Sequence, residues 1–434
     1  MQLTIEKLVY GGDGLARLPP DEQGRGKAAF VPFVLEGEKL EAVLLEQKPG
    51  FARARADQIL AASPRRIEPR CPYFQSCGGC HYQHTSYEHQ LEIKAVILKE
   101  NLRRIAKLEL DTELNLHASP GWHYRNRTRL RVHSLPDFAL GYYKFNSHEL
   151  LPVQECPISS PLINRAIAAM WQLGRAGKVS AAIREIEFFV NADDTQLLAE
   201  LHCSAETATT AELLATDLRT VLPETRGAVF LTARGSKAEA RGDVQRIAVR
   251  GADHLTYTTI LASYRVSAGS FFQVNRHLAD ELVNVVVGES AGATGTALDL
   301  YAGVGLFSSV LTRAFERVIA VESSPTSHAD LLHNSPANVK AIRATTEQYL
   351  ENAAGKLRPQ LVVVDPPRSG LGEKVIQGLA RLRAPRVIYV SCDPATLSRD
   401  LARLLPSGYR VQAAHLVDLF PQTYHLESVF HLVR

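Results

Sequence analysis

A cysteine stands immediately after an apolar run in the stretch VIYVSCDPATLSRD, residues 387–400. A cysteine that only fills a core would lie inside such a run, whereas Cys392 follows it and precedes a predicted helix. The dipole at the start of that helix is expected to stabilise a thiolate, the reactive form of the side chain. Position alone fits a structural cysteine as well as it fits a catalytic nucleophile.

Two carboxyl groups are predicted at the same edge of the fold. Asp365 follows the apolar run LVVV in VVVDPPRSG, where two prolines prevent the strand from continuing. Glu427, in HLESVFHLV, reaches the same edge if the last strand runs antiparallel to its neighbours. A thiol and two carboxyls that converge favour nucleophilic and acid–base catalysis over a structural role for Cys392.

A glycine turn and an acidic residue indicate a nucleoside cofactor. The stretch LDLYAGVGLFS contains Gly303 and Gly305, and Glu322 ends the next apolar run. An acidic residue about 20 positions after such a turn suits a ribose diol. A nicotinamide fingerprint needs a third glycine where this chain has Ser308, so S-adenosylmethionine fits better. For this motif alone, glycines that merely tighten a turn stay an alternative.

Four of the six cysteines have the spacing of a metal centre. Three of them lie in CPYFQSCGGCHYQH and a fourth follows in VQECPIS; they are Cys71, Cys77, Cys80 and Cys156. Disulfides are not expected in a cytosolic chain, so metal binding is the stronger interpretation. Four thiolates suit either tetrahedral zinc or an iron–sulfur cluster, and the spacing does not decide between them. Cys203, in LLAELHC, is interpreted as a buried apolar residue.

Four arginines alternate in GWHYRNRTRLRV and would share one face of a strand: Arg125, Arg127, Arg129 and Arg131. Alone, this pattern is typical of a solvated strand face. If other features call for nucleic acid, it becomes a candidate phosphate-binding face.

The elements that must position these residues fall into three regions. Residues 1–62 have the short strands and turns of a small antiparallel β-barrel. Residues 63–265 read as an α+β domain. From residue 266 to 434, strands and helices alternate, which predicts a doubly wound parallel sheet with an antiparallel last strand.

Composition excludes several classes of protein. The chain has 434 residues, of which 45% are hydrophobic and 22% are charged, with a net charge of +3. No apolar run approaches the roughly 18 residues of a membrane span. The first residues, MQLTIEKLVYGGDG, lack the features of a secretory signal, so we expect a cytoplasmic protein without a membrane partner.

Four motifs together resemble the RNA uracil-5-methyltransferases. They are DLYAGVGLF, VDPPRSGL, VSCDPATLSRD and HLESV, in the order and on the strands of that family. The resemblance covers nearly the whole chain. It implies a Rossmann-like class I methyltransferase domain, an N-terminal TRAM barrel (OB-like) that binds RNA, and a central iron–sulfur domain. It also implies a monomer that acts on RNA, with 23S rRNA as the expected substrate.

The resemblance assigns roles to individual residues. Cys392 would add to C6 of uracil, which makes C5 nucleophilic toward the methyl group, and Glu427 would then remove the C5 proton. The implied contacts to S-adenosylmethionine are Gln273, Tyr301, Glu322 and Asp365. The ligands implied for a 4Fe-4S cluster are Cys71, Cys77, Cys80 and Cys156. Leu306 and Thr345 depart from the family at two positions where polar residues are frequent.

Three alternatives stay open. The nearest is a methyltransferase that acts on tRNA uracil or on another base, such as C5 of cytosine, which also uses a thiol adduct. A radical enzyme would need a Cys-x3-Cys-x2-Cys spacing, and the interval from Cys71 to Cys77 is too long. The third is a non-catalytic RNA-binding protein with a structural zinc ion.

Overall fold

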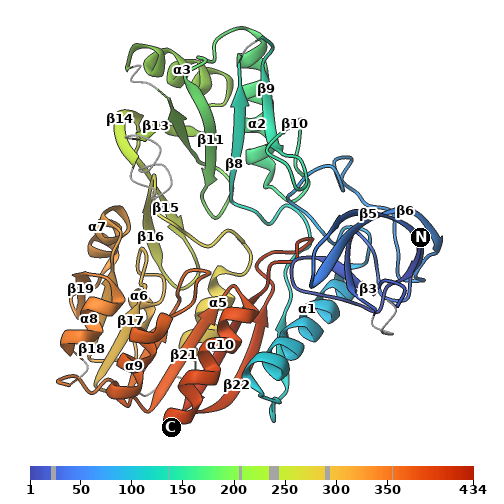
Figure 1. Cartoon of the computed structure of the whole chain (residues 1–434). Coiled ribbons are helices and arrows are strands. Elements are labelled where there is room, and N and C mark those ends of the chain that lie inside the picture. The colour runs from blue at the N-terminus through green and yellow to red at the C-terminus, as the bar shows by residue number, and fades with distance from the viewer. Residues whose placement is uncertain (21–25, 135, 205–207, 234–243, 289–293, 354) are drawn as a thin grey trace.

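Three large β-sheets and one two-stranded sheet organise the chain, and Figure 1 shows how they divide it. The computed structural model describes residues 1–434 except 21–25, 135, 205–207, 234–243, 289–293 and 354. Among the described residues, no helix is long and apolar enough to cross a membrane.

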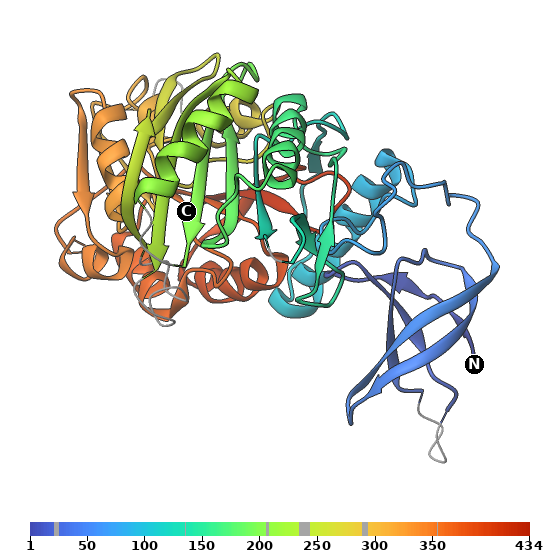
Figure 2. The same ribbon diagram turned by 90° about the horizontal axis from the view of Figure 1, so that it is seen from above.

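The strands nearest the N-terminus form one curled sheet with the order β1-β5-β6-β4-β3-β2. They are β1 (Gln2–Thr4), β2 (Lys7–Leu8), β3 (Asp13–Arg17), β4 (Ala28–Pro32), β5 (Lys39–Gln47) and β6 (Phe51–Ala61). Burial alternates along β4, so that Ala29 and Val31 fill the core of this sheet. The pairs are antiparallel as expected, apart from β4 and β6, which run parallel. In Figure 2 this N-terminal sheet stands out from the rest of the chain.

The central sheet has the order β10-β9-β8-β11-β12-β13-β14. Its strands are β8 (Arg127–His133), β9 (Ala139–Tyr143), β10 (Leu150–Pro152), β11 (Ile183–Val190), β12 (Leu197–Cys203), β13 (Thr225–Ala233) and β14 (Val244–Gly251). Helices α2 (Pro161–Arg175) and α3 (Ala208–Val221) pack on it. Phe189, Leu198 and Val229 from this sheet join the core of the third sheet, so the two parts share packing.

The third sheet is doubly wound, with the order β19-β18-β17-β20-β21-β23-β22-β7. Its strands are β7 (Leu114–His117), β17 (Thr296–Leu300), β18 (Arg317–Glu322), β19 (Val339–Arg343), β20 (Leu361–Val364), β21 (Arg386–Ser391), β22 (Arg410–Val417) and β23 (Glu427–Val433). Only β23 runs antiparallel within the described sheet. The predicted parallel sheet with an antiparallel last strand is therefore confirmed.

Helices cover both faces of this sheet (Figure 1). Helices α5 (Ala279–Val287) and α6 (Ser308–Leu311) contribute side chains to one hydrophobic core cluster. Helix α7 (Pro325–Asn334) packs near β19. The other cluster holds α8 (Thr346–Ala353), α9 (Gly372–Leu382) and α10 (Pro394–Leu404), and the short η3 (Leu405–Ser407) follows α10.

The sheet also recruits segments from before residue 266. Helix α1 (Tyr87–Asn101) and the π-helical turn η1 (Leu102–Ala106) pack against α10, and β7 extends the sheet beside β22. The hairpin of β15 (His254–Thr258) and β16 (Ser263–Ser267) packs in the core cluster that also contains α5 and α6. Segments before residue 266 therefore belong to the same packing unit as the doubly wound sheet. The sequence pattern changes only near residue 266, because these earlier segments carry no alternation of strands and helices.

Three of the four alternating arginines, Arg127, Arg129 and Arg131, pair with carboxylates, whereas Arg125 precedes β8 and lines a cavity together with Cys80 and Cys156. Arg129 pairs with Glu187 at 2.8 Å and with Glu185 at 3.5 Å, and Arg127 lies 3.5 Å from Glu187. Arg131 also pairs with Glu185. These acidic residues come from β11, the neighbour of β8, so cross-strand ion pairs occupy the face. The strand is confirmed from Arg127 on, and its use as a phosphate-binding face stays a prediction, since Arg129 and Arg131 are paired with carboxylates yet 50% and 41% exposed.

Candidate active site

The carboxyl edge of the third sheet collects the residues singled out from the sequence. Strand β20 ends at Val364 and β21 at Ser391, so Asp365 and Cys392 are the next residues of each chain segment. Because β23 is antiparallel, its first residue, Glu427, lies at this same edge, where Ser428 is paired with Ser391. The structure thus brings Cys392, Glu427 and Asp365 together, as the antiparallel strand requires.

The Cys392 thiol is held in its protonated form. Burial and the nearby carboxyls of Glu427 and Asp365 raise its pKa to about 12. The start of α10 does not oppose this effect, because the Asp393 side chain caps it and accepts from the backbone N–H groups of Ala395 and Thr396 at 3.0 and 2.8 Å. The expectation that the helix dipole stabilises a thiolate is therefore wrong: a carboxylate already occupies the helix N-terminus.

The carboxyls at this edge also hold their protons tightly. Burial, followed by the charge of Asp365, raises the pKa of Glu427 well above its usual value, while Arg368 acts in the opposite direction. Burial and the neighbouring Asp299 raise the pKa of Asp365 to about 7. A ligand that carries positive charge would relieve the crowding of these negative groups.

The glycine turn and Glu322 form one hydrogen-bonded unit beside these carboxyls. Glu322 ends β18, and its carboxylate accepts from the N–H groups of Gly303 at 2.9 Å and Ser324 at 2.6 Å. Gly305 has a φ of +94°, and a Cβ there would lie 2.9 Å from Leu331, so the turn needs glycine. The carboxylate is thereby fixed with lone pairs available for a ribose diol.

The other two predicted cofactor contacts, Tyr301 and Gln273, come from two different elements. Tyr301 follows β17 directly and has a φ of +63°, a left-handed conformation that turns the chain away from the strand. Gln273 lies in the loop after β16 and is 5% exposed. The loop is fixed by buried carboxylates: Asp330 accepts from Ser267 and Ser270, and Glu200 accepts from the N–H of Gly269 at 3.0 Å.

The two positions that depart from the family serve local structure. Leu306 is buried in the core, and its carbonyl accepts from Tyr264 Oη at 3.1 Å. Thr345 is exposed at the start of α8, where its hydroxyl accepts from the N–H of Gln348 and the Gln348 side chain accepts in return.

Sequence reasoning missed three residues at this edge. Asp299 lies within the apolar strand TALDL and is fully buried; Ser308 donates to its Oδ2, and Oδ1 has no partner among the described residues. An acidic residue inside an apolar run was the available signal. Arg368 follows the Asp-Pro-Pro motif, and its Nη2 lies 3.2 Å from His425 Nδ1. Tyr10, from the N-terminal sheet, donates to the Cys392 carbonyl at 3.2 Å, a contact without a local signal.

The loop that leads into Glu427 is anchored by a buried ion pair. Lys94 on α1 lies 2.6 Å from Asp418, and both side chains are at most 1% exposed. The Lys94 ammonium also donates to the carbonyl of Phe420 at 2.9 Å. One helical turn earlier on the same helix, Gln90 exchanges hydrogen bonds with Gln422. Helix α1 thus fixes the approach of the chain to the catalytic edge.

We expect Lys94→Met to destabilise the protein by about 3–5 kcal/mol, because the Asp418 carboxylate is then buried without a counter-ion. Urea unfolding followed by circular dichroism would show an earlier transition. Lys99→Met, at an exposed position of the same helix, is the matched control and should unfold like the wild type. Equal midpoints for both variants would contradict the assigned role of the ion pair.

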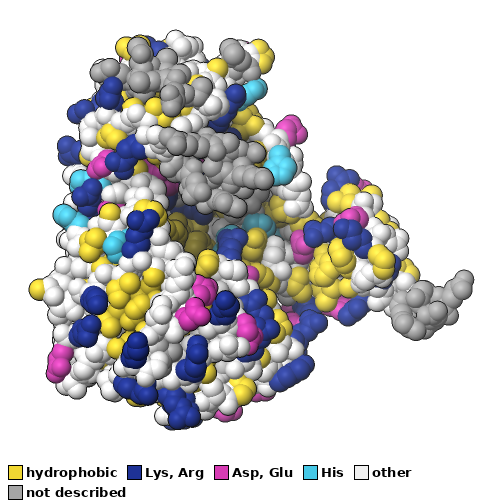
Figure 3. All heavy atoms as spheres, turned by 60° about the vertical axis from the view of Figure 1, so that its left-hand side comes forward, with side chains coloured by type: hydrophobic (Ala, Val, Ile, Leu, Met, Phe, Trp, Pro, Cys, Tyr) yellow, Lys and Arg dark blue, Asp and Glu magenta, His cyan; other side chains and the backbone are white. Residues whose placement is uncertain are grey.

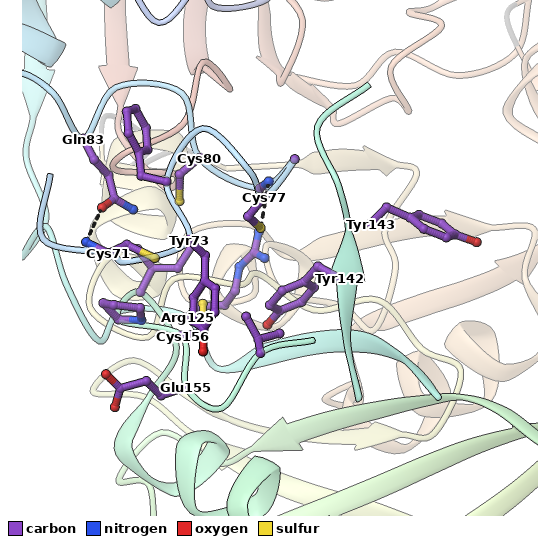
Figure 4. Close-up of a pocket in the computed structure, with 16 residues that line it drawn as sticks. Cys71, Tyr73, Cys77, Cys80, Gln83, Arg125, Tyr142, Tyr143, Glu155 and Cys156 are labelled. Carbon is purple, nitrogen blue, oxygen red and sulfur yellow. Dashed lines mark hydrogen bonds between the residues drawn. The ribbon is translucent and has the colours of Figure 1, made fainter. Parts of the chain in front are cut away.

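The four cysteines predicted to bind a metal line one cavity of about 250 Å³. They lie far in the sequence from the residues of the catalytic edge. Figure 4 shows the sulfurs of Cys71, Cys77, Cys80 and Cys156 facing a shared space, with Arg125 beside them. Three come from the loop before α1 and the fourth from the segment after β10. Among the described residues, no group of three or more His, Cys, Asp or Glu side chains is arranged to hold a single metal ion.

Relatives with curated names span nearly the whole chain. An RNA methyltransferase of Aquifex aeolicus is 33% identical over 99% of this chain and 97% of its own length. One of Halalkalibacterium halodurans is 30% identical, covering 99% and 96%. The structure of Pyrococcus abyssi tRNA (uracil-54, C5)-methyltransferase in complex with S-adenosyl-L-homocysteine covers 100% of both chains with a TM-score of 0.77 and 23% identity, which shows a shared fold.

A family model extends the comparison to the catalytic part of the chain. The model described as tRNA (Uracil-5-)-methyltransferase matches residues 86–434, the stretch that contains α1, the central sheet and the whole doubly wound sheet. The chain therefore belongs to the tRNA (uracil-5-)-methyltransferase family and is an RNA methyltransferase.

Proposed function

We propose that the protein methylates C5 of a uracil in RNA through a covalent adduct between Cys392 and C6, giving 5-methyluridine. The observation that carries this proposal is the convergence of the Cys392 thiol with the carboxyls of Glu427 and Asp365 at one sheet edge. A purely structural cysteine would not need two buried acids beside it, whose desolvation is costly.

The first half of the reaction uses the thiol. The Cys392 thiol gives its proton to water, its sulfur bonds to C6 of the uracil, and the electrons of the C5–C6 double bond move toward O4, so that the ring becomes an enolate whose C5 is nucleophilic. When bound, S-adenosylmethionine would supply the methyl group to C5 and leave as S-adenosylhomocysteine, and its positive charge suits an edge crowded with carboxyls. Gln273, Tyr301, Glu322 and Asp365 are the proposed contacts to this cofactor. The carboxylate of Glu322 is already oriented by the glycine turn.

The second half needs a base. After methyl transfer C5 carries both the methyl group and its original proton, and the Glu427 carboxylate takes that proton. The electrons of the C5–H bond then expel Cys392 from C6, which restores the ring and the thiolate. Glu427 must be ionised to act as this base, and the positive charges of Arg368 and of a bound cofactor would favour the ionised form against the effect of burial.

We expect the methylated nucleoside to be 5-methyluridine, with 23S rRNA as the proposed substrate and tRNA uracil as the second candidate because of the family model's description. The test incubates the protein and methyl-deuterated cofactor with each RNA, isolated from cells that lack the protein, and digests the products for mass spectrometry. Labelled 5-methyluridine supports the proposal. Label in 5-methylcytidine, or binding of RNA without any methylation, would contradict it.

We further propose that Cys71, Cys77, Cys80 and Cys156 ligate a 4Fe-4S cluster. A zinc site would bring four sulfurs within about 2.3 Å of one ion, and among the described residues no group of three or more such side chains is arranged to hold a single ion. Four sulfurs around one cavity suit a larger group held from four sides. The methyl transfer requires no electrons, so the proposed role of the cluster is to tie the loop before α1 to the segment after β10.

Anaerobically purified protein should be brown and contain about four irons per chain, with broad visible absorbance. Cys156→Ala should lower the iron content, whereas Cys203→Ala, at a buried cysteine of β12, should leave it unchanged. A colourless protein with one zinc ion would overturn the cluster assignment and leave the methyltransferase proposal intact.

A further inference from the structure

A second cavity lies between the N-terminal sheet and the catalytic part of the chain. Its volume is about 480 Å³, and its walls come from six segments: the β2–β3 turn, strands β4 and β6, the loop before α1, the β9–β10 turn and the loop before β23. Figure 3 shows the N-terminal sheet set apart from the main body with a notch between them. We call this cavity the aromatic groove, after the side chains that line it.

Aromatic rings dominate the walls of the groove. Tyr10 meets Tyr424 edge to face with ring centres 5.5 Å apart, and Tyr424 also meets His81 at 4.6 Å. Phe145, from the β9–β10 turn, lies on the opposite side of His81 at 6.1 Å, and Phe30 contributes from β4. Tyr10, Phe145 and Tyr424 are each only partly buried, so part of each ring is open for a nucleobase to stack on.

The polar groups of the groove suit a nucleotide. Burial and the charge of Arg368 lower the pKa of His425 to about 3, so this imidazole is neutral near pH 7. His81, in the wall of the groove, has its Nδ1 buried without a hydrogen-bond partner among the described residues. Arg53, exposed on β6, lines the groove and can approach a phosphate.

The groove is joined directly to the catalytic edge. Tyr10, one of its walls, donates to the carbonyl of Cys392 at 3.2 Å, and His425, another wall, is two residues before Glu427. A nucleotide in the groove is therefore close enough to be a chain neighbour of the base at Cys392. A target base must leave its stack to reach the thiol, and a neighbour held elsewhere helps to keep it out.

We propose that the aromatic groove binds the base of a nucleotide adjacent to the target uridine in the same single-stranded RNA segment. This inference rests on the proposed function. It assigns the N-terminal sheet a part in forming the substrate site, because Tyr10, Phe30 and Arg53 all come from that sheet.

The test measures binding of a fluorescein-labelled nonamer of oligouridylate at moderate salt. Phe145→Ala and Tyr424→Ala should each raise the Kd about 5- to 100-fold, the range expected for losing one stacked base. Affinity for S-adenosyl-L-homocysteine, measured by calorimetry, should stay the same and shows that each variant is folded. The matched control is Phe138→Ala, which removes a half-buried ring that packs on Trp171 in the central part.

A second readout locates the RNA. A nonamer that contains 5-iodouridine should photo-cross-link to peptides that carry Phe145 or Tyr424. Unchanged affinity in both variants, or cross-links only elsewhere, overturns the groove, and so does failure of the nonamer to bind. If the variants lose RNA affinity while the wild type methylates no RNA, the groove stands and the proposed function fails.

Discussion

Cys392→Ala should lower the methylation of RNA at least about 10⁴-fold and abolish every covalent complex with RNA. Without addition of sulfur at C6, the C5 carbon of uracil never becomes nucleophilic enough to take the methyl group. No later step in the sequence can compensate. The rate is measured as transfer of labelled methyl groups to RNA under single-turnover conditions, and the covalent complex by denaturing gel.

Two controls separate chemistry from folding in this variant. Cys392→Ser keeps the side-chain shape but replaces the thiol with a far weaker nucleophile, so it should be equally inactive. Cys203→Ala removes a cysteine buried in the central sheet and should methylate like the wild type. Methylation of uracil by the Cys392→Ala protein would show that C6 addition does not involve this residue.

Glu427→Gln should stop the reaction at a later step than Cys392→Ala does, so the two variants should accumulate different species. Addition and methyl transfer should still occur, but loss of the base should slow removal of the C5 proton about 10²- to 10⁴-fold. A protein–RNA adduct that survives denaturation should then accumulate with the methyl group already attached. The amide is close in size to the carboxyl, so this substitution keeps the shape of the site and removes only the group that accepts the proton.

The double variant Cys392→Ala with Glu427→Gln provides the control, because no adduct should form without the thiol. The matched control is Glu373, an exposed acid at the start of α9. Glu373→Gln should methylate RNA at the wild-type rate. Turnover of Glu427→Gln at the wild-type rate would show that another group removes the proton.

The doubly wound sheet could be predicted because each of its strands is a short apolar run followed by a turn or helix signal. TALDL, RVIAVE, LVVV and RVIYVS all became strands, and their ends met at one edge as parallel topology demands. The recruitment of α1 and β7 could not be predicted. Pairing of β7 with β22 joins residues about 300 positions apart, and nothing local in LNLH specifies that partner.

The candidate site shows the same division between local and non-local information. Asp365 and Cys392 directly follow predicted strands, and Glu427 begins one that runs antiparallel. The sequence was therefore sufficient to predict that all three lie at one edge of the sheet. The protonation of Cys392 was not predictable, since it depends on burial and on carboxyls from two other strands. The role of the arginine strand was also undetermined, because Glu185 and Glu187 face it from β11 only after the sheet forms.

The most direct test of the mechanism is the identity of the adduct trapped by Glu427→Gln. The complex formed with RNA and cofactor is digested with protease and nuclease, and the cross-linked peptide is sequenced by mass spectrometry. The mechanism predicts a uridine nucleotide bonded to Cys392 and carrying one added methyl group. An adduct on another residue, or a nucleotide on Cys392 that has gained no methyl group in the presence of the cofactor, would contradict it.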